Sequence, residues 1–150
     1  MIKLASALAL LLVGTAPLFA DDKPMNADSI KWGPAPAVIP AGAELAVMAG
    51  DPSKDGAYVL RLKMPAGYKI AAHNHPASEY VTVLSGNFHI GMGDKLDETK
   101  GTELTAGGFG IAPAGMNHFA WTTSDTIIQV NGDGPFTITY VNPADDPSKK

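Results

Sequence analysis

The ten residues "AAHNHPASEY" (71–80) place two histidines one residue apart and a carboxylate four residues after the second histidine. Side chains alternate between the two faces of a β-strand, so His73 and His75 share one face, and Glu79 has the same parity. Pro76 bends the chain between His75 and Glu79. Burying these polar groups without a partner costs about 2 kcal/mol or more, and a bound divalent cation removes that cost. The stretch therefore predicts a metal site at one end of a strand.

The segments around this stretch have the pattern of short strands separated by turns. Alternating or β-branched runs occur at 57–64, 79–86, 87–93, 125–130 and 136–142. Glycine and proline interrupt the chain between these runs, and no helical repeat is visible after residue 20. We expect 79–86 and 87–93 to form a hairpin, and the charged segment 93–101 to be a solvated loop. The pattern predicts an all-β fold, either a sandwich or a small antiparallel barrel.

A third histidine follows a Pro-x-Gly turn in "GGFGIAPAGMNHFAW" (107–121). The turn leads to His118 at the head of a predicted strand, where the small residues Ala120 and Thr122 share its face and leave room for a ligand. Three imidazoles and one carboxylate would leave one or two coordination positions open on a metal, as Lewis-acid or oxygen chemistry requires. The donors suit one divalent transition metal ion, and they do not distinguish Fe, Mn, Ni, Cu and Zn.

The fourth histidine, His89, is expected outside this group. In either short hairpin register its side chain lies on the face opposite Val81 and Val83. By the same alternation Trp121 points away from the metal site, and we expect it to pack in a core or an interface. Met92 shares a face with Val81 in one of the two registers, where it would line the pocket or fill space.

Residues 1–20 have the pattern of a secretory signal peptide. Lys3 precedes the apolar run "LASALALLLVG", and "TAPLFA" leads into the charged "DDKP", so we expect cleavage after Ala20 and a periplasmic or secreted protein. The alternative is a retained membrane anchor, but the apolar run is shorter than the roughly 20 residues that span a bilayer. Residues 21–41 are rich in proline and are expected to form an extended arm, with Ile30 and Trp32 as anchors.

The composition excludes some classes of partner. Without Lys3 the mature chain would carry 10 basic and 15 acidic residues, a net charge of −5, and its only basic run is Lys149-Lys150. Phosphate binding depends on clustered Lys and Arg, so nucleic acid is not expected as a partner. The chain has no cysteine, so His, Asp, Glu or Met must hold any metal. We expect a small-molecule ligand and, after signal cleavage, no membrane partner.

Two spaced motifs resemble those of the cupin superfamily. The first, G-x5-H-x-H-x3,4-E-x6-G, is matched within residues 67–86 at every fixed position. The second, G-x5-P-x-G-x2-H-x3-N, begins at residue 107 and departs only at Thr122, where the family has Asn. The matched positions are Gly67, His73, His75, Glu79, Gly86, Gly107, Pro113, Gly115 and His118. With the flanking strands, the resemblance covers residues 42–141.

The resemblance implies an antiparallel jelly-roll β-barrel over residues 42–141, followed by a flexible tail at 142–150. It implies a metal near the barrel mouth with the ligands His73, His75, Glu79 and His118. The alternative is a barrel that kept this shape and lost the metal. Cupins commonly form dimers through edge strands and the N-terminal segment, so we expect a homodimer in which the arm 21–41 has a role.

Two functions fit these expectations. The first is an exported metal-dependent enzyme of the dioxygenase, isomerase or lyase type, in which Glu79 is a ligand that also accepts a proton. The second is a non-catalytic domain that binds or senses a small molecule or a metal. Arg61, the only arginine, shares a face with Val59 and Lys63 that is expected to point to solvent. Anionic substrates are therefore less expected than neutral or chelating ones, and the fold does not decide between the two functions.

Overall fold

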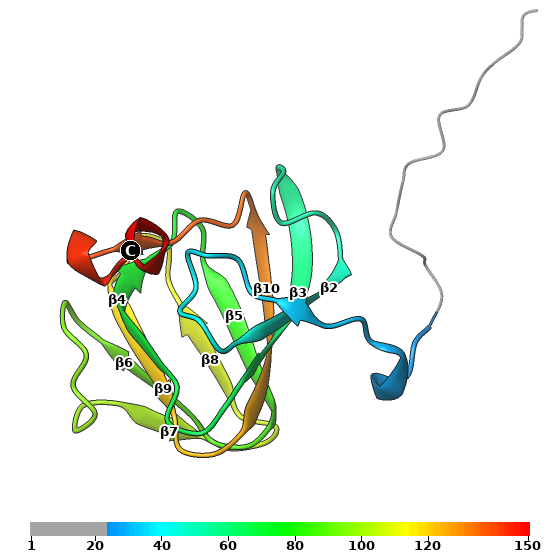
Figure 1. Cartoon of the computed structure of the whole chain (residues 1–150), viewed down its shortest axis with the longest axis horizontal. Helices are drawn as coiled ribbons and strands as arrows, with labels where there is room; N and C mark the ends of the chain where they lie inside the picture. The colour runs from blue at the N-terminus through cyan, green and yellow to red at the C-terminus, as the bar shows by residue number, and fades with distance from the viewer. Residues whose placement is uncertain (1–23) are drawn as a thin grey trace, which may run out of the picture.

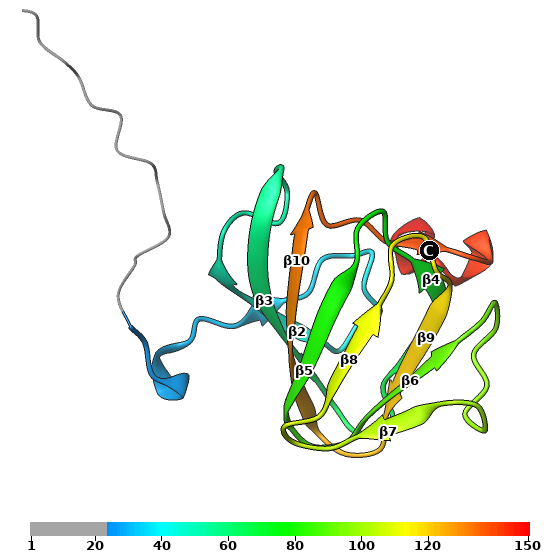
Figure 2. The ribbon, with the colours of Figure 1, turned by 180° about the vertical axis from the view of Figure 1, so that it is seen from behind.

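Two antiparallel sheets face one another and form a jelly roll (Figures 1 and 2). The computed structural model describes residues 24–150, so the predicted signal peptide lies outside the described residues. The larger sheet contains, in spatial order, β1 (Gly33–Pro34), β2 (Glu44–Ala49), β3 (Gly56–Met64), β10 (Thr126–Gly134), β5 (Glu79–Ser85) and β8 (Phe109–Ala112). The smaller sheet contains β11 (Thr139–Tyr140), β4 (Lys69–Asn74), β9 (His118–Thr122), β6 (Phe88–Met92) and β7 (Thr102–Leu104). The predicted all-β jelly-roll fold is confirmed.

The core lies between the sheets because inward-facing residues alternate with outward-facing ones. Along β3, the side chains of Tyr58, Leu60, Leu62 and Met64 are buried, and those between them are more exposed. The same alternation buries Val83 of β5 completely. Each fully buried aliphatic side chain contributes about 1.5–3 kcal/mol to folding. The period-two pattern in the sequence therefore corresponds to the two faces of each sheet.

The predicted hairpin between 79–86 and 87–93 is wrong. β5 pairs with β10 and β8 in the larger sheet, whereas β6 pairs with β9 and β7 in the smaller one. The chain crosses between the sheets at Gly86, where φ is +80° and a Cβ atom would lie 2.3 Å from the Asp125 carbonyl oxygen. The backbone N–H of the next residue, Asn87, lies within hydrogen-bonding distance of the Ser124 and Thr126 hydroxyl groups. This corner therefore depends on contacts with a segment almost 40 positions away.

The segment before β2 packs against the core through Ile39, which is 5% exposed. The hydroxyl groups of Tyr68 and Tyr140 donate hydrogen bonds to backbone carbonyls on either side of Ile39. Ile39 is therefore the buried anchor of the arm, rather than the predicted Ile30 and Trp32, which are only partly buried.

The charged segment 93–101 is a loop with most of its residues exposed, as predicted, but it also packs over part of the smaller sheet. Its Leu96 packs against Phe119 and Trp121, which form a small second cluster on the outer face of the smaller sheet. A Cβ atom at Gly101 would lie 2.1 Å from the Trp121 ring, so the loop passes directly over that ring. The expectation that Trp121 has a packing role is confirmed.

Three single-turn 3-10 helices complete the described chain: η1 (Ala27–Ser29), η2 (Pro143–Asp145) and η3 (Pro147–Lys149). The last two lie within the predicted tail 142–150, and the side chains of Asn142 and Asp146 cap them. Within residues 24–150, no helix has the length and apolar character needed to cross a membrane. The predicted domain boundaries stay predictions.

Candidate metal centre

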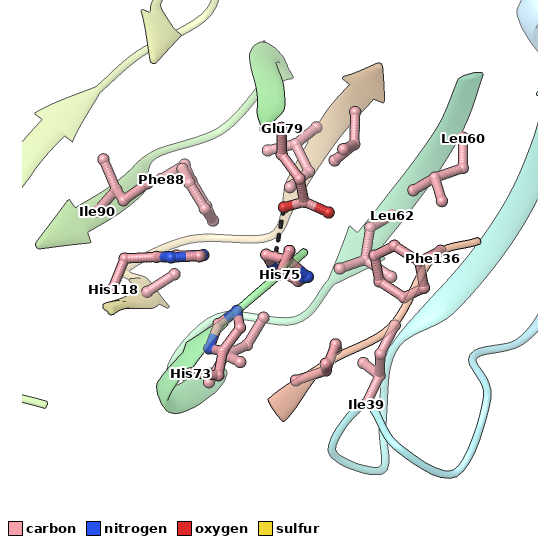
Figure 3. A pocket seen from close by; sticks show the side chains of 15 residues that line it. Ile39, Leu60, Leu62, His73, His75, Glu79, Phe88, Ile90, His118 and Phe136 are labelled. Carbon is pink, nitrogen blue, oxygen red and sulfur yellow. Dashed lines mark ion pairs between the residues drawn. The ribbon is translucent and has the colours of Figure 1, made fainter. Parts of the chain in front are cut away.

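Strands from both sheets bring the predicted site residues together (Figure 3). β4 and β9 pair His73 directly with His118, so both side chains point to the same inner face. His75 follows the end of β4, and Glu79 begins β5 in the opposite sheet. The Pro-x-Gly turn before β9 is held in place because the N–H of Gly115 donates to the His75 carbonyl at 2.8 Å.

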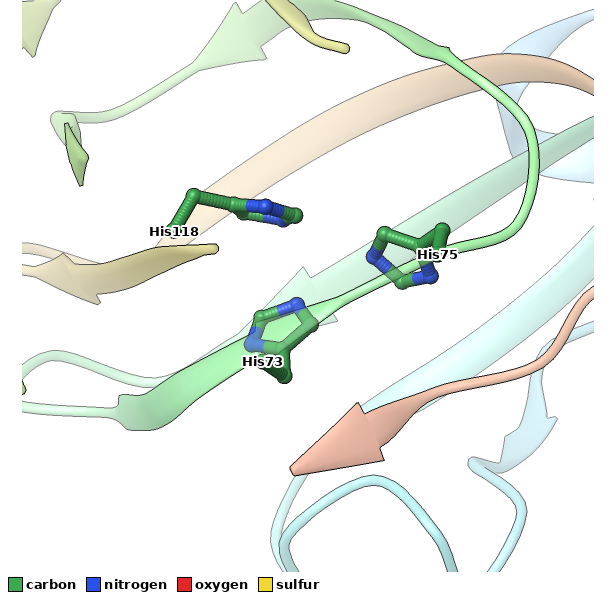
Figure 4. A group of neighbouring side chains, drawn as sticks. All are labelled: His73, His75 and His118. Atoms are coloured by element: carbon green, nitrogen blue, oxygen red, sulfur yellow. The ribbon is translucent and has the colours of Figure 1, made fainter. Parts of the chain in front are cut away.

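The three histidine rings converge inside the barrel (Figure 4). One ring nitrogen from each of His73, His75 and His118 lies within 4.8 Å of the other two. Each of these residues is only 4% exposed. Metal–nitrogen bonds are about 2.1 Å long, so small rotations of the rings would bring all three nitrogens to one ion. The group could hold a metal.

Hydrogen bonds set which ring nitrogen of each histidine faces the centre. Nδ1 of each ring lies 2.7–3.0 Å from a backbone carbonyl oxygen. The acceptors are Ala71 for His73, Thr137 for His75 and Met116 for His118. A carbonyl oxygen only accepts hydrogen bonds, so each Nδ1 carries the proton. Each Nε2 then has a free lone pair, which is the form of imidazole that binds a metal.

The carboxylate of Glu79 faces His75 across the cavity. Its Oε2 lies 3.2 Å from Nε2 of His75, which is an ion-pair distance (dashed line in Figure 3). Because the proton of His75 is on Nδ1, both facing atoms are acceptors unless a proton or a cation lies between them. Nε2 of His75 and Oε1 of Glu79 are buried without a hydrogen-bond partner. Unpaired buried polar atoms cost about 1–3 kcal/mol each, and a bound cation would satisfy them, so these residues fit a metal ion.

Burial keeps the histidines unprotonated. Desolvation lowers the pKa of His73 to about 3 and the pKa of His75 to about 4, and it also lowers the pKa of His118. Burial raises the pKa of Glu79 to about 7. At neutral pH the three imidazoles therefore have free lone pairs, and a bound cation would keep Glu79 ionised.

An apolar cavity of about 50 Å³ adjoins these four residues. Its other walls are Ile39, Leu60, Leu62, Ile70, Phe88, Ile90, Ala120, Ile128, Val130, Phe136 and Ile138. One water molecule needs about 10–15 Å³ of such space, so the cavity has room for a few waters or a very small ligand. No Lys or Arg is among the described residues that line it. Arg61 instead donates to Gln129 at 3.1 Å on the outer face, as its strand parity predicted.

His89 and Met92 lie outside this cavity. His89 stacks on Trp121 with 4.7 Å between ring centroids, so its predicted exclusion from the metal group is confirmed. The hairpin register used for that prediction was wrong, but alternation along β6 alone gives the same face. Met92 is 46% exposed and does not line the cavity, so its predicted place in the pocket is wrong.

Thr122, where the second motif departs from the cupin pattern, supports the strand that carries His73. Its side chain is almost fully buried. Its hydroxyl accepts from the Tyr68 N–H at 3.1 Å and donates to the Pro65 carbonyl at 2.6 Å. Gly67 also donates its N–H to the Thr122 carbonyl at 3.0 Å. These bonds close the turn before β4.

Sequence reasoning missed the contribution of the segment before β11. The run 136–142 was predicted as a strand, but only Thr139–Tyr140 forms one. Phe136 and Ile138 instead line the cavity, and the Thr137 carbonyl accepts the hydrogen bond from His75. The shared parity of residues 136, 138 and 140 was the signal that could have placed these side chains inside.

Comparisons with known proteins agree with this architecture. A family model described as the ChrR cupin-like domain matches residues 21–137. No curated protein matches the chain. The polyketide cyclase RemF from Streptomyces resistomycificus is similar over 85% of this chain and 90% of its own, with 15% identity and a TM-score of 0.68. A candidate acetylacetone dioxygenase from Methylibium petroleiphilum is similar over 85% of this chain and 86% of its own, with 21% identity and a TM-score of 0.63.

An RmlC-like cupin from Shewanella frigidimarina is also similar, over 73% of this chain and 87% of its own, with 16% identity and a TM-score of 0.57. At sequence identities of 15–21%, the similarity to these three structures shows only that the fold is shared. The four-residue ligand set, with Glu79 as its fourth member, stays a prediction.

Replacing His118 with alanine is expected to abolish tight metal binding, whereas replacing His89 with alanine is expected to leave it unchanged. The first change removes one of three converging nitrogens, and the second removes a ring on the outer face. Isothermal titration with Zn²⁺ or Co²⁺ measures both affinities. Equal losses in the two variants would contradict the assignment of the centre.

In the metal-free protein, stability is expected to fall as the pH is lowered from about 6.5 towards 4. The folded-state pKa values of His73 and His75, about 3 and about 4, lie below the usual 6.5, so the unfolded state binds more protons in this window. Glu79 acts in the opposite direction between pH 4.5 and about 7, because burial raises its pKa. Each titrating group contributes about 1.4 kcal/mol per pH unit, and the histidines outnumber the single carboxylate.

Urea denaturation in EDTA at pH 7, 6 and 5 measures this trend. A stability that stayed constant or rose towards pH 5 would contradict the buried, unprotonated state of the histidines.

Proposed function

Because the chain belongs to the ChrR cupin-like domain family, we propose that it is a metal-dependent enzyme with one divalent transition metal ion per chain. We propose dioxygenase-type chemistry on a small neutral or metal-chelating molecule. The observation that carries this proposal is the convergence of three unprotonated imidazole nitrogens beside a buried carboxylate. This donor set suits Fe, Mn, Ni, Cu or Zn.

The geometry supports a role for each of the four polar residues. His73, His75 and His118 would hold the ion through Nε2, and Glu79 would add an oxygen ligand. A bound ion of this kind supplies Lewis-acid or redox chemistry at the positions that the protein leaves open. Oε1 of Glu79 has no hydrogen-bond partner, so it is available to accept a proton from a substrate bound beside it. The apolar walls exclude bulk water from these atoms.

The residues around the cavity favour oxygen chemistry over isomerisation or elimination. Isomerisation and elimination are acid–base reactions, which enzymes commonly catalyse with a pair of titratable groups that have separated pKa values. Among the described lining residues, Glu79 is the only titratable side chain besides the three histidines. With the histidines engaged as ligands, one carboxylate remains for proton transfer.

The lining also favours a neutral or chelating substrate. No described cationic side chain lines the cavity, so an anionic group would have only the metal ion as its counter-charge. A chelating molecule with two carbonyl oxygens could occupy two open positions on one ion. The similar fold named as a candidate acetylacetone dioxygenase supports small diketones as the first compounds to test.

The alternative is a non-catalytic domain that binds or senses a small molecule or a metal. The small size of the cavity, about 50 Å³, favours this alternative because it admits only a few non-hydrogen atoms without movement of the walls. A sensing domain needs the metal centre but no turnover, and so the two functions differ in a measurable way.

Elemental analysis and oxygen uptake together test the proposed enzyme. Protein purified without a metal-affinity tag or chelator is expected to contain close to one Fe, Mn, Ni or Cu per chain. With acetylacetone or a related small diketone, it is expected to consume oxygen in proportion to the diketone lost, measured with an oxygen electrode. His118→Ala should abolish this uptake, and His89→Ala should preserve it.

Two outcomes would contradict the proposal in different ways. A bound metal without oxygen uptake across the diketones would favour the binding or sensing domain. Folded protein that neither contains nor takes up a metal would contradict the enzyme and would support a barrel that has lost its metal, or a domain that binds a small molecule without one.

We also propose that the chain is exported, with residues 1–20 removed, and that the mature form is a homodimer. The match to the family model begins at residue 21, the residue that would follow cleavage, which supports the first part. An exposed apolar patch on the outer face of β5 and β8 supports the second part. It contains Tyr80, Leu84, Phe109 and Ile111, and it carries no charged side chain.

One preparation from the periplasmic fraction tests the mature form. Intact mass spectrometry is expected to give a chain that begins at Asp21, and sedimentation velocity is expected to give a dimer. Phe109→Glu should shift the protein to monomer, whereas Val47→Glu, at another exposed apolar position, should not. A full-length mass would overturn cleavage, and a monomeric original chain would overturn the dimer.

A further inference from the structure

The ring of Tyr58 lies over a glycine of the neighbouring strand. That strand is the middle one of three. Tyr58 of β3 pairs with Gly132 of β10. A Cβ atom at Gly132 would lie 2.5 Å from the Tyr58 hydroxyl oxygen and 2.8 Å from the ring carbon that bears it. The ring therefore covers the inner face of Gly132, and any larger residue at position 132 would displace the hydroxyl group.

The strand order directs this hydroxyl group towards Glu79. β10 lies between β3 and β5, and its Asn131 pairs with Val59 on one side and Tyr80 on the other. The next residue, Gly132, therefore lies between Tyr58 and the start of β5 at Glu79. The Tyr58 hydroxyl lies over Gly132, so it lies on the inner face beside the start of β5 at Glu79.

Packing restrains the tyrosine ring in this position. Tyr58 is 3% exposed, and the edge of Phe136 meets its ring at 86° with 6.0 Å between centroids. Phe136 in turn packs against the ring of His75 at 5.6 Å. Tyr58 thus packs against Phe136, which contacts His75, and its hydroxyl group lies beside the start of β5, although Tyr58 does not line the cavity itself.

A carboxylate beside a metal needs a second partner to fix its orientation. Groups that hydrogen-bond a metal ligand typically change metal affinity by about 10–100-fold when they are removed. Glu79 is held close to His75 at 3.2 Å, yet its Oε1 has no partner. The Tyr58 hydroxyl is the neighbouring donor that can keep this carboxylate directed at the histidines.

We propose that Tyr58 is a positioning residue for the metal centre, which orients the Glu79 carboxylate through a hydrogen bond made across the gap at Gly132. The proposal rests on the proposed metal site, but it requires no turnover. It assigns Tyr58 no contact with metal or substrate.

Three variants and a cobalt probe test this assignment. Tyr58→Phe removes the hydroxyl group and keeps the ring, and Gly132→Ala displaces the hydroxyl group without changing the tyrosine. Tyr68→Phe is the matched control, because it removes another inward hydroxyl group whose acceptor is the Pro40 carbonyl, away from Glu79. Co²⁺ affinity is measured by chelator competition, and the visible absorption of the Co²⁺ protein reports its coordination.

Tyr58→Phe and Gly132→Ala are each expected to weaken Co²⁺ binding at least tenfold and to alter the cobalt spectrum, whereas Tyr68→Phe leaves both unchanged. In a Glu79→Gln background, Tyr58→Phe is expected to cause no further loss, because the tyrosine acts through Glu79. Thermal unfolding of the metal-free variants shows that each is folded, and Gly132→Ala serves if Tyr58→Phe does not fold.

Unchanged affinity and spectrum in the folded Tyr58→Phe or Gly132→Ala variant would overturn the assignment. A further tenfold loss in the Glu79→Gln background would also overturn it, because the tyrosine would then act independently of Glu79. Failure of the original chain to bind Co²⁺ would instead remove the metal site and the positioning role with it. Tight Co²⁺ binding without oxygen uptake would overturn only the enzymatic function and leave the positioning role in place.

Discussion

The hydrogen bond from each buried imidazole Nδ1 to a backbone carbonyl is the constraint on which the centre depends. The three acceptors belong to β4, to the turn before β9 and to the segment before β11. The acceptors of His73 and His118 lie two residues before their own histidine, whereas the acceptor of His75 lies 62 residues away, and all three adjoin strands of the smaller sheet. Once these bonds form, each proton is held on the outer nitrogen and each Nε2 lone pair faces the cavity. The fold therefore decides the protonation pattern of the histidines as well as their position.

The other properties of the site result from its enclosure, because an apolar cavity surrounds four polar residues. The smaller sheet contributes His73 and His118, and Glu79 comes from the larger sheet, so a bound ion would link the two sheets. Binding of this kind stabilises the folded state, because the unfolded chain has no such arrangement. The same enclosure that makes the lone pairs available also limits the size of a ligand, which is why metal binding and turnover have to be tested separately.

Sequence reasoning succeeded where the relevant geometry is local to one strand. Alternation placed His73 and His118 on an inner face and left His89 and Arg61 outside, because side-chain parity depends only on the backbone of that strand. It failed for strand pairing. Residues 79–93 have the pattern of a hairpin, but the chain changes sheets at Gly86, where the 124–126 segment packs too closely for a side chain. Met92 pairs with the inward-facing His118, but it is the last residue of β6 and is exposed there.

The sequence by itself determined the all-β class, the inward parity of the histidines, the spacing of the two motifs and the absence of a cationic patch. Only the tertiary structure decided which strands pair, which carbonyl holds the His75 imidazole, how small the cavity is and that Ile39 anchors the arm. It also decided that the Tyr58 hydroxyl lies over Gly132, beside the start of β5 at Glu79. The physical reason is that alternation is set by adjacent residues, whereas pairing and enclosure depend on contacts between residues tens of positions apart. The free energy of those contacts is a property of the whole packed chain.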